Sequence, residues 1–475
     1  MKKLFALLLA LSMVLSMGLL AGCQSGDGEG SDGETAVANF NVPESGYDGS
    51  EVTLTFYHTM GANLREVLDY YIAEFNKLYP NIHIEHSQVG SYDDVRDQIS
   101  TELTVGGQPN IAYCYPDHVA LYNTAGAVTH LDNLIASTIE VTRADGTTEV
   151  LGLTEAQVND FIDGYYAEGA CYGDGLMYTL PLSKSTEVLY YNKTFFDDNG
   201  LTVPTTWEEM ETVCEQIKAL DPNCVPLGYD SSANWFITMC EQYGADYTSA
   251  TGSSHYLFNN DTAKGFVKTF REWYQKGYVT TQDLWGSYTS ELFTADAGEI
   301  RCYMCIGSTA GASYQKAPNG EFEVEIATIP QVDASNPKVI SQGPSLCIFN
   351  SENEQEVIAS WLFVKYLTTS IEFQAEFSMV SGYVPVLESV MDNEVYADYI
   401  GSADGYNYLT ALSTKVALEQ ANAYYVSPAF NGSSTAREQV GFLLDAAISG
   451  NDNGNIDSFI DGLFEDAVDE CEYSE

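Results

Sequence analysis

The residues best suited to catalysis or metal binding are few in this chain and do not form a reactive pattern. The sequence has six histidines and ten cysteines among 475 residues. His83 and His86 lie three positions apart on an expected strand, so they face opposite sides of it and make a poor metal pair. Cys302 and Cys305 form a single Cys-x-x-Cys motif, also on an expected strand and without a second motif to complete a zinc site. The sequence therefore predicts no metal and no cofactor.

Catalytic motifs are absent as well. No HExxH, GxSxG, P-loop or GxGxxG pattern stands in a suitable context. Paired carboxylates are too common in so acidic a chain to indicate a glycosidase. The cysteines after Cys23 are scattered without a disulfide framework; most are expected to be buried apolar residues, and a Cys214–Cys224 disulfide stays open. The chain is not expected to be an enzyme.

Composition and charge set the class of protein. The chain is 45% hydrophobic, with 19 Lys and Arg against 68 Asp and Glu, a formal net charge of −49. A field of that sign repels phosphate backbones and anionic lipids, so nucleic-acid binding is excluded. A chain of 475 residues also exceeds what one hydrophobic core usually supports, which predicts two lobes.

The N-terminus is typical of an exported lipoprotein. Lys2 and Lys3 precede an apolar run at 4–20, followed by Leu-Ala-Gly-Cys ending at Cys23. This sequence resembles the bacterial lipobox, which implies cleavage after residue 22 and lipid on Cys23. Residues 1–22 are then a signal peptide and residues 23–50 a flexible acidic Gly/Ser tether. The mature protein is expected on the extracellular face of the cell membrane, anchored through Cys23.

Periodicity in the folded part indicates an α/β fold. Apolar and polar residues alternate at 52–57, which predicts a strand. Apolar residues at helical spacing follow up to Pro80 and predict a helix. The patterns of a strand, a helix and a further strand then follow up to Tyr115. Such alternation predicts mainly parallel sheets, whose ligands bind beyond the carboxyl ends of the strands. His58 lies at one of these ends.

The stretch at 178–196, YTLPLSKSTEVLYYNKTFF, is the one around which the rest is organised. The hydroxyl residues Ser183, Ser185 and Thr186 precede an apolar run at 188–191 that is typical of a buried strand. Such a stretch can carry the chain from one lobe to the other and present polar groups to a ligand. A plain core strand is the alternative.

Several motifs resemble the extracellular solute-binding proteins of ABC importers, family 1, and within it the branch that binds glycerol 3-phosphate. Besides 178–196, the matching segments occur in family order from about residue 51 to the C-terminus: 90–92, 161–166, 204–207, 234–235, 306–309, 342–346 and 381–386. The resemblance implies a type II periplasmic-binding-protein-like fold, with two α/β lobes that close on a ligand like a hinge. We expect lobe I at 51–183 plus about 335–378, and lobe II at 184–334 plus about 379–475.

The resemblance also implies ligand contacts and partners. The positions that match cleft residues are Tyr92, Ser185, Ser308, Gly343 and Tyr383. Trp235 is similar to the family's aromatic platform, and Asp117 takes the place of a glutamate one position earlier. The implied function is capture of a carbohydrate or polyol and its delivery to the transmembrane permease subunits of an ABC importer with a cytoplasmic ATPase. The protein is expected to be a monomer.

One departure from the branch bears on the ligand. The branch places a phosphate-binding arginine in the segment that matches 427–432, which here has no basic residue. Arg437 and Lys184 are the nearest candidates, and neither matches the motif. This favours a neutral sugar or oligosaccharide over glycerol 3-phosphate or a glycerophosphodiester. Two alternative functions stay open. One is a surface glycoside hydrolase, and the other is an adhesion or sensor lipoprotein without a transporter.

Overall fold

The computed structural model describes residues 40–296, 298–401 and 408–474. The predicted signal peptide, Cys23 and residues 24–39 of the predicted tether lie outside the described residues. Phe40, Val42 and Tyr47, which the sequence assigned to the end of the tether, pack against the core of the first lobe. Ordered packing thus starts before Glu51. Within the described ranges, no helix has the length and apolar character needed to cross a membrane.

The first lobe is built on a five-stranded sheet in the order β2-β1-β3-β13-β6. Its strands are β1 (Val52–His58), β2 (Ile82–Gln88), β3 (Ile111–Cys114), β6 (Thr179–Pro181) and β13 (Ser345–Ile348). β1 runs parallel to β2 and β3, as the alternation of strands and helices predicted. β13 runs antiparallel to both of its neighbours because it belongs to a segment that returns from the other lobe.

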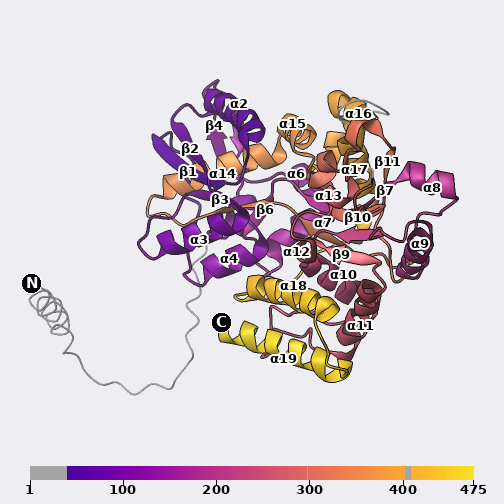
Figure 1. The fold of residues 1–475 in the computed structure, drawn as a ribbon. Helices are drawn as coiled ribbons and strands as arrows, with labels where there is room; N and C mark the ends of the chain where they lie inside the picture. Colours follow the sequence, from indigo (N-terminus) through magenta and orange to yellow (C-terminus); the bar gives the residue numbers. More distant parts are fainter. Residues whose placement is uncertain (1–39, 297, 402–407, 475) are drawn as a thin grey trace, which may run out of the picture. The chain divides into compact units, whose positions relative to one another are not determined.

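Helices from two distant parts of the chain cover this sheet. The first part supplies α2 (Ala62–Leu78), α3 (Tyr92–Leu103) and α4 (Pro116–Asn123), and the second supplies α14 (Glu354–Thr369) and α15 (Ile371–Ser381). α14 packs against β1 and β13, and α15 against α2, so orange and indigo segments lie side by side (Figure 1). Smaller elements complete this part of the chain: α5 (Asp132–Ile135), β4 (Glu140–Thr142), β5 (Thr148–Val150), α6 (Glu155–Asp160) and α7 (Asp163–Ala167).

The second lobe is built on a seven-stranded sheet in the order β14-β12-β7-β10-β8-β9, with β11 also paired to β7. Its strands are β7 (Ser185–Asn192), β8 (Leu227–Tyr229), β9 (Val279–Thr281), β10 (Met304–Ser308), β11 (Val324–Ala327), β12 (Val339–Gln342) and β14 (Tyr424–Tyr425). β8, β9 and β10 are parallel, whereas β7 runs antiparallel to β10, β11 and β12. The sheets are therefore mixed, with the predicted parallel order confined to part of each.

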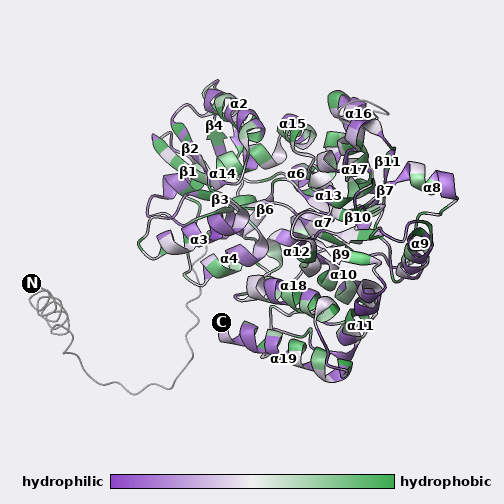
Figure 2. Cartoon of the chain, viewed as in Figure 1, coloured by the Kyte–Doolittle hydropathy of each residue, from purple (hydrophilic) through white to green (hydrophobic). Residues whose placement is uncertain are grey.

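Helices pack around the second sheet and against one another. They are α8 (Lys193–Asn199), α9 (Trp207–Leu220), α10 (Ser232–Tyr243), α11 (Asp261–Gln275), α12 (Gln282–Trp285), α13 (Ser290–Phe293), α16 (Glu394–Ile400), α17 (Tyr408–Glu419), α18 (Ser433–Ser449) and α19 (Ile456–Ser474). α11 buries Phe266, Phe270 and Trp273 on one face and keeps the opposite face polar, a division visible in Figure 2. α18 contacts α10, α11 and α19, so the C-terminal helices belong to this lobe.

Three segments connect the lobes. Residues 182–184 lead from β6 to β7, Gly343 and Pro344 lead from β12 to β13, and Val384 follows α15. The stretch at 178–196 thus contributes one strand to each sheet, as expected of a connection between lobes. β12 lies in the second sheet and β13, which follows Gly343 and Pro344, lies in the first.

Candidate ligand-binding site

Two adjoining cavities lie where residues of both lobes meet, and Tyr115 and Gln342 line both of them. The large cavity has a volume of about 740 Å³. Its lining is rich in hydroxyl, amide, carboxylate and phenol groups: Tyr115, Ser185, Glu187, Asp230, Ser231, Asn234, Gln282, Tyr288, Ser290, Glu291, Thr294, Ser308, Gly311, Tyr314, Gln315, Gln342 and Tyr383. A polar lining of this kind suits a ligand with many hydrogen-bonding groups.

Strand ends position most of these side chains. Ser185 and Glu187 come from the first residues of β7, and Ser308 is the last residue of β10. Asp230 directly follows β8, at the same edge as Ser308 because β8 and β10 are parallel. Asp230 and Ser308 thus lie at the carboxyl ends of parallel strands, the place where the sequence pattern predicts ligand-binding groups.

Glu187 is the most deeply placed acid of the large cavity, with 1% of its surface exposed. Its carboxylate accepts hydrogen bonds from the Tyr229 hydroxyl at 2.6 Å and from the Asn234 amide at 2.9 Å. Burial raises the pKa of Glu187 to about 7, although these hydrogen bonds and the charge of Arg437 act in the opposite direction. Near neutral pH this side chain is therefore divided between its protonated and its ionised form.

Asp230 is held against β10 by Thr289 and by the absence of a side chain at Gly307. Its Oδ1 accepts hydrogen bonds from the Thr289 backbone N–H at 2.8 Å and from the Thr289 hydroxyl at 2.7 Å. A Cβ atom at Gly307 would lie 2.5 Å from Oδ2 of Asp230, so only glycine permits this approach. Burial raises the pKa of Asp230 above its ordinary value.

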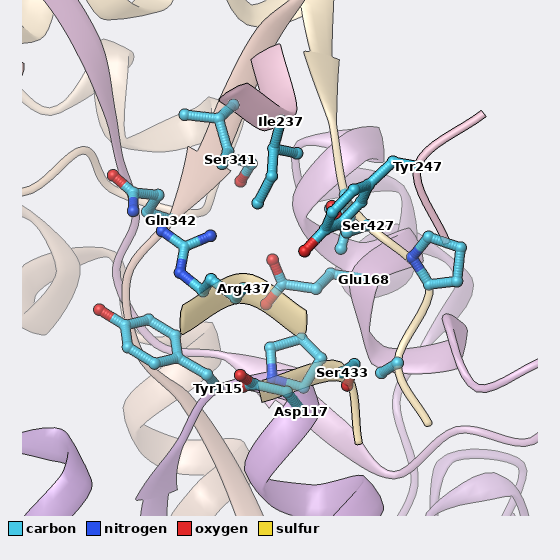
Figure 3. Close-up of a pocket in the computed structure, with 15 residues that line it drawn as sticks. Tyr115, Asp117, Glu168, Ile237, Tyr247, Ser341, Gln342, Ser427, Ser433 and Arg437 are labelled. Atoms are coloured by element: carbon cyan, nitrogen blue, oxygen red, sulfur yellow. The ribbon is translucent and has the colours of Figure 1, made fainter. Parts of the chain in front are cut away.

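The small cavity, of about 160 Å³, contains a guanidinium. Its lining consists of Tyr115, Pro116, Asp117, Glu168, Ile237, Tyr247, Ile340, Ser341, Gln342, Val426, Ser427, Pro428, Ala429, Ser433 and Arg437. In Figure 3 the Arg437 guanidinium lies beside Gln342, with Tyr115 and Glu168 to either side. Arg437 donates a hydrogen bond to Oδ1 of Asn234, which also accepts one from Gln342 at 3.3 Å. These three side chains link the two cavities.

A cluster of tyrosines forms the first lobe's contribution. Tyr92 stacks on Tyr115 with ring centroids 4.5 Å apart, and its side chain interacts with that of Tyr383. Burial raises the pKa of Tyr92 well above its ordinary value. Tyr115 and Tyr383 line the large cavity, whereas Tyr92 supports them from behind. Tyr92 therefore positions two lining residues and does not itself line either cavity.

Four other predicted residues also lie at the two cavities or beside them. Ser185 and Ser308 line the large cavity, as Tyr383 does, and Asp117 lines the small one. Gly343 adjoins Gln342 but has a different task from the one expected. Its φ is +105°, and a Cβ atom there would lie 2.6 Å from the Ser183 carbonyl oxygen. The missing side chain thus allows two connecting segments to touch.

Trp235, expected as the aromatic platform, instead lies in the core of the second lobe. It is fully buried, with its ring 4.9 Å from that of Tyr229 and 4.0 Å from that of Phe270. α10 is buried on nearly all sides, so the apolar residue at 235 faces the core while Asn234 faces the cavity. The exposed aromatics of the large cavity are Tyr288 and Tyr314, at 61% and 74% exposure.

His58 is likewise a structural residue and not a cavity residue. It is fully buried, and its Nδ1 accepts a hydrogen bond from the Met60 backbone N–H at 3.1 Å. Nε2 must then carry the proton and donate to Nδ1 of His86 at 2.8 Å, and Nε2 of His86 donates to Asp69. Burial lowers the pKa of His58 to about 3, which keeps the ring neutral.

Lys184, a candidate phosphate ligand from the sequence, is occupied elsewhere. It is fully buried and forms an ion pair with Glu168, while its ammonium also donates to the Gly343 carbonyl and to the Ser345 hydroxyl. Arg437 is thus the cation that borders the cavities, and Lys184 is part of the connection between lobes.

Sequence reasoning did not single out Glu187, Asp230, Asn234 or Gln342 as ligand residues. Glu187 and Asn234 stand inside two of the matching segments, and Gln342 opens a third. Asp230 follows a short buried strand, which was the available signal for it. The acidic residues were overlooked because carboxylates are common throughout this chain.

Comparison with known proteins defines the class. A model of the bacterial extracellular solute-binding protein family matches residues 70–403. The chain belongs to this family, which confirms the resemblance to solute-binding proteins of ABC importers seen in the sequence.

Individual relatives are distant. The sn-glycerol-3-phosphate-binding periplasmic protein UgpB of Escherichia coli (strain K12) is 23% identical over 361 residues, covering 72% of this chain and 75% of that protein. The cyclic alpha-maltosyl-1,6-maltose binding protein of Arthrobacter globiformis has a TM-score of 0.67 at 18% identity, over 89% of this chain and 100% of its own. UgpB of Mycobacterium tuberculosis, solved with glycerophosphocholine, has a TM-score of 0.69 at 17% identity, over 89% and 99%. These structures confirm the two-lobed fold.

Proposed function

We propose that this solute-binding protein captures a carbohydrate in the large cavity and delivers it to the permease of an ABC importer. The observation that carries the proposal is the lining of that cavity. Hydroxyl, amide and carboxylate groups from both lobes converge on about 740 Å³, with four tyrosines among them. Sugar hydroxyls need many convergent donors and acceptors, and the C–H face of a sugar ring packs on an aromatic face.

Closure supplies the signal to the permease in this proposal. Ser185 and Gln342 stand at the connections between lobes, Tyr115 and Tyr383 come from the first lobe, and most other lining residues come from the second. A ligand that touches both groups favours the closed state by its differential affinity for the two states. No bond of the ligand needs to break for this function.

The exposed tyrosines are the aromatic platforms in this proposal, in place of Trp235. Tyr314→Ala should weaken sugar binding about tenfold or more, because stacking on an aromatic ring is lost. Tyr70→Ala is the matched control, since Tyr70 is 55% exposed on α2 and does not line either cavity. Equal binding by both variants would contradict the assignment.

Thermal unfolding of residues 24–475, which omit the expected lipid-carrying Cys23, against sugars, oligosaccharides, polyols and glycerol phosphates tests the ligand class. A ligand at a hundred times its Kd stabilises the native state by about 2.7 kcal/mol, a clear shift in Tm. We expect shifts with one or more sugars and none with glycerol phosphates. Release of new reducing ends during the incubation would instead indicate a glycoside hydrolase.

Binding of a glycerol phosphate or glycerophosphodiester is the second candidate, and Arg437 is the observation that favours it. Its guanidinium lines the small cavity next to residues shared with the large one. Under this alternative a glycerophosphodiester would raise Tm and Arg437→Met would abolish the shift. The hydrogen bond from Arg437 to Asn234 and the two acids at the small cavity, Asp117 and Glu168, weigh against it.

We also propose that Cys23 carries the lipid that tethers the protein outside the cell membrane. The Leu-Ala-Gly-Cys motif after an apolar run supports this assignment. Cys23→Ser should release the protein from the membrane fraction and abolish its labelling by a fatty acid fed to the cells. Labelling that persists in the variant would refute the role of Cys23.

A further inference from the structure

The charges that face the large cavity are all of one sign. Its described lining residues include three carboxylates, Glu187, Asp230 and Glu291, and no lysine or arginine. The nearest guanidinium, that of Arg437, lines the small cavity and acts on Glu187 through Asn234. Glu187 is only partly ionised near pH 7, but Asp230, Glu291 and the ionised fraction of Glu187 still outweigh the single cation and leave the site negative. A ligand phosphate or carboxylate would meet repulsion here, whereas a positive group would be attracted.

A side chain that lines the same cavity carries an unpaired acceptor. Gln315 lines it with only 2% of its surface exposed. Its amide nitrogen contacts the Cys305 sulfur at 3.4 Å, while its Oε1 has no hydrogen-bond donor among the described residues. Buried acceptors left without a donor cost free energy, so this oxygen calls for an N–H or O–H group from a ligand.

The aromatic rings of the cavity fit the same kind of ligand. Tyr288 and Tyr314 are exposed and line it together with Tyr115 and Tyr383. The face of an aromatic ring attracts a cation, and carboxylates combined with such faces recognise organic ammonium groups.

The arrangement of these groups suits an organic cation better than a metal ion. Across the described ranges, no group of three or more His, Cys, Asp or Glu residues is arranged to hold a metal. The two most buried carboxylates are already engaged by neutral donors, Glu187 by Tyr229 and Asn234, and Asp230 by Thr289. An ammonium group needs only some of their remaining lone pairs and does not require a closed coordination shell.

We propose that the large cavity binds an amine-bearing sugar, with the ammonium group at Asp230, Glu187 and Gln315 and the sugar rings against Tyr288 and Tyr314. This inference rests on the proposed carbohydrate function and names the class of carbohydrate. The hydroxyls of the sugar are donors to Ser, Asn and Gln side chains, and the ammonium group offsets the acids that Arg437 leaves unbalanced.

Matched ligands test the charge directly. Calorimetry at pH 7 would compare glucosamine and its β-1,4-linked di- to tetramers with the N-acetylated and the 2-hydroxyl sugars of the same length and linkage, and with α-1,4-linked glucose oligomers. Choline and putrescine provide ammonium groups without a sugar. We expect an aminated sugar to bind at least about tenfold more tightly than its uncharged counterparts, with an affinity that falls as salt is added.

Substitutions of single acidic residues test which carboxylate interacts with the ammonium group. Asp230→Asn should reduce the affinity for the aminated sugar about tenfold or more and leave that for the uncharged counterpart nearly unchanged. If Asp230→Asn fails to fold, Glu291→Gln removes another negative charge from the same lining and should weaken binding of the aminated sugar alone, by a smaller factor. Glu85→Gln removes one exposed negative charge from β2, outside both cavities, and should change neither affinity.

The outcomes separate this inference from the broader function. If uncharged sugars bind as tightly as aminated ones, or only uncharged sugars bind, the ammonium site is refuted and carbohydrate binding stands. Binding of choline or putrescine alone would refute the sugar as well. If no sugar of any kind binds, the proposed function and this inference fail together.

Discussion

Glu187 ties the stability of the protein to pH. Its folded-state pKa of about 7 lies above its ordinary value of 4.5, so the folded protein holds the proton more tightly than the unfolded chain does. The resulting stabilisation is fully present below about pH 4.5 and is lost as pH rises through 7. Tyr229, Asn234 and Arg437 moderate the effect, and Asp230 adds to it.

Glu187→Gln should therefore change stability in a pH-dependent manner. Glutamine keeps a similar shape and carries no charge, so the variant should gain stability relative to the native protein between pH 5 and pH 8, by at most about 3 kcal/mol. Urea unfolding of both proteins at several pH values measures the difference. Taking the difference removes contributions from other acids such as Asp445, whose pKa is also raised, to about 6. A difference that is independent of pH would contradict the prediction.

The sequence predicted some of the cavity-lining residues correctly and others not. Ser185, Ser308 and Tyr383 stand in motifs that match the family, and all three line the large cavity. Trp235 stands in such a motif too, but whether a helical residue faces the core or the cavity depends on how its neighbours pack. Local pattern gives no sign that α10 is enclosed on nearly all sides.

At the scale of elements, the connections between lobes are fixed by contacts among their backbones. Gly343 has a φ of +105° and lies against Ser183 and Lys184. Gly343→Ala should destabilise the protein by about 1–3 kcal/mol, because the new Cβ both strains the backbone and overlaps the adjacent segment. Thermal unfolding measures this loss.

Gly265 is the matched control for that substitution. It lies on the exposed face of α11, and nothing stands within 4 Å of a Cβ atom added there. Gly265→Ala should be neutral or stabilising by up to about 1 kcal/mol, since alanine favours helix more than glycine does. Equal losses from the two alanines would show that close contact at Gly343 is not the cause.

The ion pair between Lys184 and Glu168 is a second contact that holds these connections together. Lys184 reaches the Gly343 carbonyl and the Ser345 hydroxyl, and its backbone pairs with that of Val384 in both directions. Lys184→Met leaves Glu168 buried without its cation and should cost about 3–5 kcal/mol. Adding Glu168→Gln to that variant should recover part of the loss, which urea unfolding of the single and double variants would measure. No recovery in the double variant would mean that packing, and not charge, dominates at this position.

The order of elements was predictable only where it is local. Alternating Val52, Leu54 and Phe56, and the helical spacing after them, identified β1 and α2, and with them the parallel start of the first sheet. β13 enters that sheet from about 230 residues further along, opposite Cys114. Its antiparallel direction depends on how the second lobe folds. The local sequence pattern of β13 carries no information about that folding.

At the scale of the molecule, a net charge of −49 acts on the fold and on the ligand alike. Like charges spread over two lobes repel one another, and this repulsion opposes the compact state. The ion pairs that offset it are mostly exposed, such as Lys268–Asp457 and Lys276–Glu211, and exposed pairs contribute little. The folded protein therefore retains a long-range repulsion that dissolved salt screens.

Salt should for this reason stabilise the protein. The Debye length falls from about 30 Å at 0.01 M ionic strength to about 8 Å at 0.15 M, so repulsion between distant carboxylates is largely screened over this range. We expect Tm to rise as sodium chloride is added up to about 0.15 M and to level off above it, with potassium chloride giving the same curve. Sulfate salts are unsuitable, because they also strengthen the burial of apolar surface. A Tm that stays constant or falls over this range would mean that ion pairs, weakened by the same salt, outweigh the repulsion.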